Sequence, residues 1–134
     1  MTIQRITSAE VTEPAPGTWS NCLKTGDTVY VAGLTARDKQ LKPTGGEEYE
    51  QARLIFDRIR HLVTAAGGTM RDVVKINIYM TRIEHREEVW RARREFFDGA
   101  FPVATLVEVS SLAQPEILVE IEAVAALGHG GRPV

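Results

Sequence analysis

The stretch that decides the fold is residues 101–125, FPVATLVEVSSLAQPEILVEIEAVA. It predicts two adjacent strands, residues 103–109 and residues 117–125. The second strand carries Glu120 and Glu122 on one face, inside an otherwise apolar run. A carboxylate on a half-buried strand costs free energy unless it is paired, hydrogen-bonded or used in chemistry. These two glutamates are therefore the first candidates for a functional site.

Two helices are predicted upstream of this stretch. The first is marked by apolar residues at helical spacing and is ended by a pair of glycines. Its apolar positions are Ala52, Ile55, Phe56, Ile59, Leu62, Val63 and Ala66, and Gly67 and Gly68 follow. The second helix is predicted over residues 84–97, with apolar positions at Val89, Trp90, Phe96 and Phe97 and with Gly99 at its end.

Four further strands complete the predicted fold. Residues 1–6 predict a short strand, and residues 19–24 and 28–32 predict a hairpin around Thr25-Gly26-Asp27. Residues 73–80 alternate apolar and polar side chains, as a half-buried strand does. The element order β, β, β, α, β, α, β, β predicts an α+β fold in which a mixed sheet carries two helices on one face.

The other face of the predicted sheet has no helix to cover it. We expect it to display a mixture of polar and apolar side chains, namely Lys75, Asn77, Ala104, Leu106, Glu108, Leu118, Glu120, Glu122 and Val124. An uncovered and partly apolar sheet face is typical of a protein interface. The pattern therefore predicts a closed, symmetric oligomer.

Length and composition describe an ordinary globular chain. Its 134 residues fit a single domain, residues 1–134, with a flexible tail over residues 127–134. The formal net charge of −2 indicates neither nucleic acid nor an anionic membrane as a partner. The single Cys22 excludes an internal disulfide, and no apolar run is long enough to span a bilayer. We therefore expect a cytoplasmic protein.

Eight short motifs, in this order and spacing, resemble the RidA family, which is also called YjgF and contains imine and enamine deaminases. They are GTWS at 17–20, VYVAG at 29–33, TG at 44–45, AGG at 66–68, VVK at 73–75, FF at 96–97, PVAT at 102–105 and VEIEA at 119–123. The resemblance implies a chorismate-mutase-like fold and a homotrimer whose sheets form a central β-barrel. It also implies that small ligands bind in the clefts between subunits.

Members of this family with deaminase activity hydrolyse imines such as 2-aminoacrylate to keto acids and ammonia, and an arginine in a P-x-R motif binds the substrate carboxylate. The matching positions here are Pro102, Val103 and Ala104, so the arginine is missing. Further departures from the family pattern cluster at the same site: Trp19 and Arg93 stand for tyrosines, Ala32 for a serine, Leu34 for a glutamine and Trp90 for an asparagine. The family's glutamate is present as Glu120.

Glu120 is the candidate general base, because a carboxylate in a partly apolar cleft gains a raised pKa and can accept a proton from water. The alternative is a structural carboxylate bonded to a neighbouring strand or to Lys75, and a structural role is favoured for Glu122. Since Ala104 cannot bind a carboxylate, either the ligand lacks one or Arg37 or Arg93 supplies the positive charge. The alternative for each arginine is a solvated surface residue.

The remaining candidates concern the shape of the cleft. Trp19 and Trp90 favour a flat ligand of low polarity, with core packing as the alternative. Thr105 is a possible hydrogen-bond donor, although a β-branched residue is ordinary in a strand.

Cys22 is interpreted as a buried thiol and not as a nucleophile, because no histidine lies near it in sequence. The scattered histidines and the single cysteine give no metal motif, and no cofactor is expected.

Two functional hypotheses follow. The first is a divergent RidA-like enzyme that hydrolyses a small imine or enamine but uses 2-aminoacrylate poorly. The second is a non-catalytic module of the same fold that binds a small ligand or regulates a partner. Ribonuclease activity, also attached to the family, is disfavoured because the chain is acidic and lacks a basic and aromatic strip. The sequence leaves open whether the protein is an enzyme, and it identifies neither the ligand nor the pathway.

Overall fold

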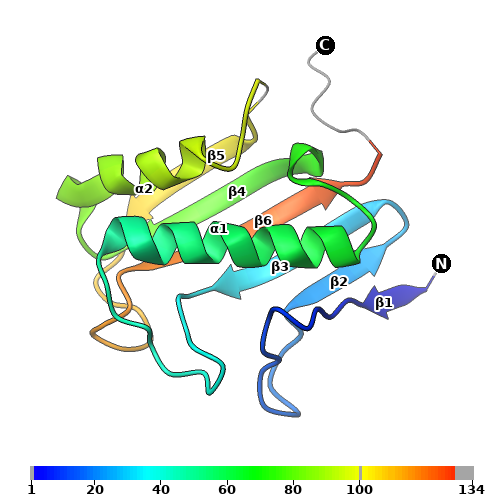
Figure 1. The fold of residues 1–134 in the computed structure, drawn as a ribbon, viewed down its shortest axis with the longest axis horizontal. Coiled ribbons are helices and arrows are strands. Elements are labelled where there is room, and N and C mark those ends of the chain that lie inside the picture. Colours follow the sequence, from blue (N-terminus) through cyan, green and yellow to red (C-terminus); the bar gives the residue numbers. More distant parts are fainter. Residues whose placement is uncertain (1, 100, 129–134) are drawn as a thin grey trace.

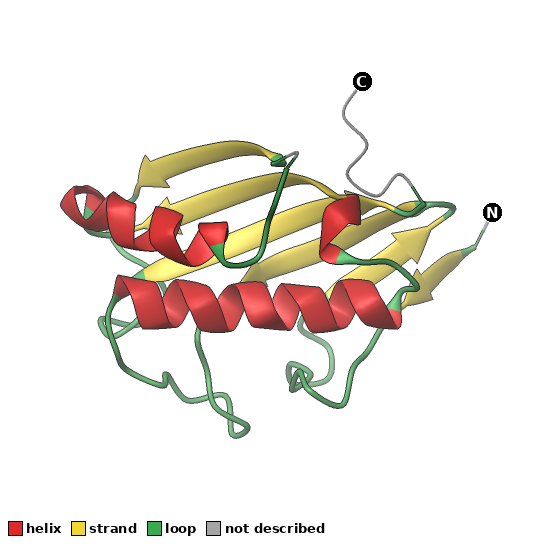
Figure 2. Ribbon diagram, turned by 45° about the horizontal axis from the view of Figure 1, so that its top comes forward, coloured by secondary structure: helices red, strands yellow, loops and turns green. Residues whose placement is uncertain are grey.

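A computed structural model describes residues 2–99 and 101–128 of the chain. In this part of the chain, six strands form one sheet with the order β1-β2-β3-β6-β4-β5, and two α-helices lie along one face of it (Figures 1 and 2). The strands are β1 (Ile3–Arg5), β2 (Cys22–Thr25), β3 (Thr28–Leu34), β4 (Val73–Met80), β5 (Val103–Glu108) and β6 (Val119–Ala126). The helices are α1 (Glu48–Ala65) and α2 (Arg86–Arg94), with short 3-10 turns η1 (Met70–Asp72) and η2 (Ile83–His85).

The sheet is mixed, as the sequence predicts. Strand β4 pairs parallel with β5, and all other neighbouring strands pair antiparallel. The predicted α+β architecture and the order of its elements are confirmed. The predicted domain tail begins at residue 127, and its residues 129–134 lie outside the described part of the chain.

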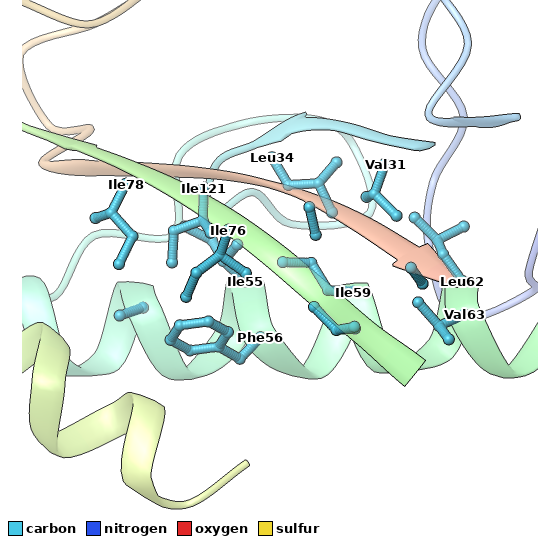
Figure 3. Packing of buried hydrophobic residues seen from close by; sticks show 14 of the residues in the cluster. Val31, Leu34, Ile55, Phe56, Ile59, Leu62, Val63, Ile76, Ile78 and Ile121 are labelled. Atoms are coloured by element: carbon cyan, nitrogen blue, oxygen red, sulfur yellow. The ribbon is translucent and has the colours of Figure 1, made fainter. Parts of the chain in front are cut away.

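Helix α1 supplies the main contact between the layers. Its apolar residues follow the 3.6-residue period, so they form one stripe that packs on the sheet. Figure 3 shows this contact between the helix residues Ile55, Phe56, Ile59, Leu62 and Val63 and the sheet residues Val31, Leu34, Ile76, Ile78 and Ile121. All ten side chains are apolar and buried, so the layers pack without polar groups between these residues. After the helix, Gly67 has a φ of 100°, a conformation that suits glycine alone.

A buried ion pair fixes the start of α1 against the chain that follows β4. Glu48 is 1% exposed and accepts hydrogen bonds from Nε and Nη2 of Arg82, both at 2.7 Å. Burial acts to raise the pKa of Glu48, but the hydrogen bonds and the charge of Arg82 outweigh it and hold the pKa below its ordinary value. A buried carboxylate of this kind is tolerated because its oxygens meet a bidentate guanidinium.

The second helix is shorter than predicted. The segment predicted over residues 84–97 begins as η2 and continues as α2 only to Arg94. The last turn then tightens, because Phe96 N–H donates to the carbonyl of Arg93. Phe96 and Phe97 leave the helix and pack their rings on Phe56, with centroids 5.7 and 5.8 Å away. The strands also differ from the predicted ranges by a few residues at their ends.

The predicted membership of the uncovered face is wrong for four residues. In the parallel register, Ala104, Leu106 and Glu108 align with Ile76, Ile78 and Met80, so they point to the helix side of the sheet. Glu108 accepts a hydrogen bond from the Ile83 N–H at 3.0 Å on that side. Leu118 packs partly against the core. A shift of one residue along β5 reverses every side chain, and the open face carries Val103, Thr105 and Val107 instead.

The open face is therefore ordered in rows that run across the strands. The first row is Tyr30, Val124, Lys75 and Val103, the second is Glu122, Asn77 and Thr105, and the third is Glu120, Tyr79 and Val107. Tyr30, Val103 and Val107 are 50%, 68% and 41% exposed. None of the described helices has the length and apolar character needed to cross a membrane.

Candidate active site beside Glu120

Glu120 lies on the open face of β6, next to the irregular end of β3. The register between β3 and β6 shifts between Val31 and Leu34, which brings Gly33 against the Glu120 side chain. A Cβ added at Gly33 would overlap the Glu120 carboxylate and would lie 3.0 Å from its Cδ. Glycine at this position thus gives the carboxylate the space that it occupies.

The environment of Glu120 disfavours its charge. Burial and the neighbouring Glu122 carboxylate raise the pKa of Glu120, and the Arg37 guanidinium offsets part of this effect. In the described part of the chain, no hydrogen-bond donor contacts the Glu120 carboxylate. A raised pKa makes the half-buried Glu120 carboxylate, which has no donor in the described chain, a stronger proton acceptor than an ordinary glutamate.

Glu122 lies on the same strand and face but has a different environment. Its Oε1 accepts hydrogen bonds from Asn77 Nδ2 at 3.1 Å and from the Tyr79 hydroxyl at 2.8 Å. The bond to Glu122 raises the pKa of Tyr79, because it favours the protonated phenol. Two donors satisfy this carboxylate, which agrees with the structural role favoured for it.

A small cavity of about 60 Å³ opens beside Gly33. Its wall contains two of the predicted site residues, Trp19 and Arg37, together with Val11, Thr12, Pro14, Asn21, Leu34, Thr35, Asp38, Leu41 and Arg58. The exposed Trp19 indole donates from Nε1 to Asn21 Oδ1 at 3.2 Å, and Asn21 is itself buried. This hydrogen bond fixes the orientation of the Trp19 indole, which forms the aromatic part of the cavity wall.

Arg37 follows β3 and reaches this cavity with an ordered guanidinium. Its Nε donates to Thr35 Oγ1 at 3.0 Å, and its Nη1 donates to the Leu41 carbonyl at 2.8 Å and to Gln114 Oε1 at 3.0 Å. The guanidinium is near enough to lower the pKa of Glu120, yet the described residues show no ion pair between the two within 4.0 Å. The space between them is the centre of the candidate site.

The other four predicted site residues lie away from Glu120 within the chain. Trp90 and Arg93 belong to α2, on the opposite side of the sheet, where Trp90 is half-buried under the Arg86 guanidinium. Arg93 Nε is buried and has no hydrogen-bond partner among the described residues, and burial followed by the charge of Arg94 lowers its pKa. The edge strand β5 carries the other two: Ala104 on the helix side and the exposed Thr105 on the open face.

Cys22 is buried and does not line the cavity, although it directly follows Asn21. Burial, with a smaller effect of Glu13, raises the pKa of its thiol to about 11. A thiol with this pKa is protonated at neutral pH and is a poor nucleophile. Among the residues that the structure describes, no cluster of histidine, cysteine and carboxylate side chains has the geometry to hold a metal ion.

Sequence reasoning did not identify Gly33, Asn21 and Gln114 as parts of the site. A glycine inside a strand pattern is a recognised sign of close approach by another group, so Gly33 carried a usable signal. Asn21 and Gln114 carried none. Gln114 reaches Arg37 across 77 positions of the sequence, and no local pattern predicts such a contact.

Comparison with known proteins gives matches along nearly the whole chain. A family model described as Endoribonuclease L-PSP matches residues 10–127. The 2-iminobutanoate/2-iminopropanoate deaminase of Dermatophagoides farinae is 28% identical over 130 residues, which cover 95% of this chain and 99% of that protein. A structure of a protein of unknown function from Pseudomonas aeruginosa is 35% identical with a TM-score of 0.88, covering 99% of this chain and 98% of that one. The structure of RidA from an Antarctic Psychrobacter is 29% identical with a TM-score of 0.82, covering 92% and 99%.

Proposed function

The chain belongs to the endoribonuclease L-PSP family, known also as the RidA/YjgF family, and from this premise we propose that it hydrolyses a small imine or enamine. The reaction would take place in clefts between the subunits of a homotrimer, with Glu120 as the general base. The observation that carries the proposal is the Glu120 carboxyl, which has a raised pKa, lacks a donor in the described chain and lies beside a cavity lined by Arg37.

The chemistry asked of Glu120 is proton transfer to and from water. Its carboxylate accepts a proton from a water molecule as the water oxygen bonds to the imine carbon, and it then gives this proton to the imine nitrogen. The product is a carbinolamine, in which one carbon bears both a hydroxyl and an amino group. Glu120 next moves the hydroxyl proton to the nitrogen, the carbon–nitrogen bond breaks, and the carbonyl product and ammonia leave with the carboxylate restored.

The assembly is proposed from the open face and the exposed edge of β5. A shallow groove of about 330 Å³ lies on this face, lined by residues that include Tyr30, Lys75, Asn77 and Glu122. Exposed apolar side chains at Val103 and Val107 extend it to the sheet edge. Packing of three copies through this surface would bury these side chains. It would also place Thr105 of one copy near Glu120 of the next, within a single cleft.

Ala104 sets a limit on the substrate. It offers no charge for a carboxylate, and it faces the helix side of the sheet. We therefore expect slow turnover of 2-aminoacrylate, for which the family's arginine provides the main hold. Ribonuclease activity, which the description of the family model names, fits this chain poorly, because two carboxylates lie on its open face and would repel a phosphate backbone.

The test compares two isosteric changes on one strand. An imine with an aromatic side chain is generated in the assay by an amino-acid oxidase acting on phenylalanine, and keto-acid release above the spontaneous rate is measured for the wild type, Glu120→Gln and Glu122→Gln. We expect Glu120→Gln to lower the rate by at least about 100-fold, the usual contribution of a general base. Glu122→Gln keeps an oxygen that accepts both hydrogen bonds, so its rate should stay within about threefold. Equal rates for Glu120→Gln and the wild type would show that Glu120 is not the general base.

A second candidate function is a non-catalytic binding module. It is favoured by the preformed cavity and by the absence of a charge at Ala104. Under this alternative, the wild type shows no turnover of any imine offered, while small molecules still stabilise the protein. A ligand at about 100 times its Kd adds roughly 2.7 kcal/mol of stability, which a melting screen detects. Loss of turnover in Glu120→Gln would exclude it.

A further inference from the structure

Arg37 is fixed in place before any ligand arrives. Three acceptors hold its Nε and Nη1: the Thr35 hydroxyl, the Leu41 carbonyl and the Gln114 side chain. Among the described residues, no hydrogen bond uses Nη2. A guanidinium whose rotamer is already fixed loses little entropy when it binds an anion, so the two N–H groups of Nη2 remain as prepared donors.

The loop after Arg37 contains a residue with a strained backbone, and this residue supplies one of the acceptors that hold the Arg37 guanidinium. Leu41 has a φ of 65°, the only non-glycine residue with positive φ that the structure describes. The Leu41 N–H donates to the Asp38 carbonyl at 3.0 Å, and this tight turn aims the Leu41 carbonyl at Arg37 Nη1. A left-handed conformation at a branched residue is strained, and such strain is typical of segments that position a binding group.

The charge around the cavity favours an anion. Arg58 also lines it and donates from Nη1 to the Arg37 carbonyl at 3.0 Å. Among the described residues of the wall, the one carboxylate is that of Asp38, and its Oδ1 accepts the backbone N–H groups of Gln40 and Lys42 at 2.8 and 3.0 Å. Two guanidinium groups thus face one carboxylate that the turn already uses, and the cavity carries a positive field.

We propose that Arg37 binds the carboxylate of a 2-imino acid or 2-oxo acid, whose planar side chain lies along Trp19. The cavity of about 60 Å³ suits such a head group, while the exposed indole gives the side chain a flat surface. The carbon next to the carboxylate then faces the gap between Arg37 and Glu120. Arg37 would also meet the carboxylate of 2-aminoacrylate, but this molecule has only a methylene group in place of a planar side chain against Trp19, so it stays a poor substrate. This inference rests on the proposed function for the reaction, but the binding of the carboxylate does not require catalysis.

The experiment measures binding of a stable acid and its neutral ester. Phenylpyruvate and methyl phenylpyruvate are titrated into the wild type, Arg37→Gln and Arg53→Gln by isothermal calorimetry. The wild type should bind the acid at least about tenfold more tightly than the ester, because only the acid carries the charge. Arg37→Gln should remove this preference, because it should lower the affinity for the acid and leave the affinity for the ester unchanged. Arg53→Gln is the matched control, since Arg53 pairs with Glu95 at an exposed site on the helix side.

Three results would overturn the inference. They are equal affinities of the wild type for acid and ester, an acid affinity that survives Arg37→Gln within about twofold, and an acid affinity that falls with Arg93→Gln and not with Arg37→Gln. If Arg37→Gln does not fold, Arg37→Lys replaces it: lysine keeps the charge but lacks the planar guanidinium that Thr35, Leu41 and Gln114 hold in place, so the acid should bind about fivefold or more weakly. An unchanged affinity in Arg37→Lys then overturns the inference.

The two proposals fail in different ways. Acid binding that depends on Arg37, in a protein that hydrolyses no imine, supports the anion site and contradicts the proposed catalysis. Imine hydrolysis that depends on Glu120, with unchanged acid binding in Arg37→Gln, contradicts the anion site and supports the catalysis. Glu120→Gln itself should retain acid binding, because it removes a negative charge from the neighbourhood of the ligand.

Discussion

The carboxyl groups of Glu120 and Glu122 show how two identical side chains on one strand acquire different properties. Asn77 and Tyr79 donate to Glu122, whereas the described chain gives Glu120 no donor. Glu120 has burial and a like charge beside it, so its ionised form is the costly one. A residue held in this state reduces the stability of the folded protein at neutral pH, which is a typical property of functional groups.

The raised pKa of Glu120 makes a prediction about stability and pH. A carboxyl whose folded pKa is raised favours the fold while it is protonated, below the ordinary pKa of glutamate, and this contribution is lost as the pH rises through the folded pKa. Glutamine cannot ionise. The difference in melting temperature between Glu120→Gln and the wild type should therefore grow in favour of the variant from about pH 4 to about pH 8. Thermal melts measure this difference, because a change of 1 kcal/mol in the free energy of unfolding shifts Tm by about 4 °C. A difference that is constant over this range contradicts the assigned environment.

Gly33 predicts a separation of activity from stability. An alanine Cβ there would meet the Glu120 carboxylate, which can move because it is the end of a flexible side chain. Gly33→Ala should lower kcat/KM for imine hydrolysis about tenfold or more, since small misplacements of a catalytic group are costly. The free energy of unfolding from urea titration should stay within about 1 kcal/mol. Full activity in this variant would mean that the position of the carboxylate is unimportant.

At the scale of elements, the segment before β6 is pinned to α1 by one buried side chain. Gln51 is 2% exposed, donates from Nε2 to the carbonyls of Gly46 and Glu116, and accepts the Leu118 N–H at 2.9 Å. The same segment carries Gln114, which holds Arg37 at 3.0 Å. Helix α1 thus positions the candidate anion site through a chain of hydrogen bonds.

Gln51→Leu removes these bonds and leaves the backbone groups without partners. We expect a loss of about 3 kcal/mol in the free energy of unfolding, and faster hydrogen exchange at the Leu118 amide. Urea denaturation and exchange measured by NMR check both. The control is Arg53→Gln, at an exposed ion pair that should contribute less than about 1 kcal/mol. If the Leu118 amide exchanges as slowly in Gln51→Leu as in the wild type, other contacts hold the segment.

The sequence predicts some elements well and others poorly for physical reasons. The stripe of α1 and the alternation in β4 are local patterns, and the structure has both elements. Strand β5 has apolar residues on both faces, so its pattern cannot decide which face is covered, and only its pairing with β4 does. The same holds for the site. Glu120 could be identified from the cost of its charge, but the contact between Gln114 and Arg37 joins distant segments.

At the scale of the whole molecule, the account requires that copies of the chain meet through the open face and the β5 edge. Val103 ends the first row of this face and is 68% exposed. Val103→Asp should leave the fold of the chain intact, because its side chain does not enter the core, but it should weaken the assembly at least about tenfold by placing charges in an apolar interface. Sedimentation at several concentrations measures the change, and circular dichroism checks the fold. An assembly as stable as that of the wild type would place the interface elsewhere.

The most direct test is the molar mass of the species that carries the activity. The wild-type protein is separated by size, its mass is read by light scattering, and keto-acid release from an imine is assayed across the peak. The account predicts a single species of three times 14.9 kDa whose activity follows the protein and disappears in Glu120→Gln. A monomer of 14.9 kDa with full activity would contradict the claim that the cleft at Glu120 is built between copies.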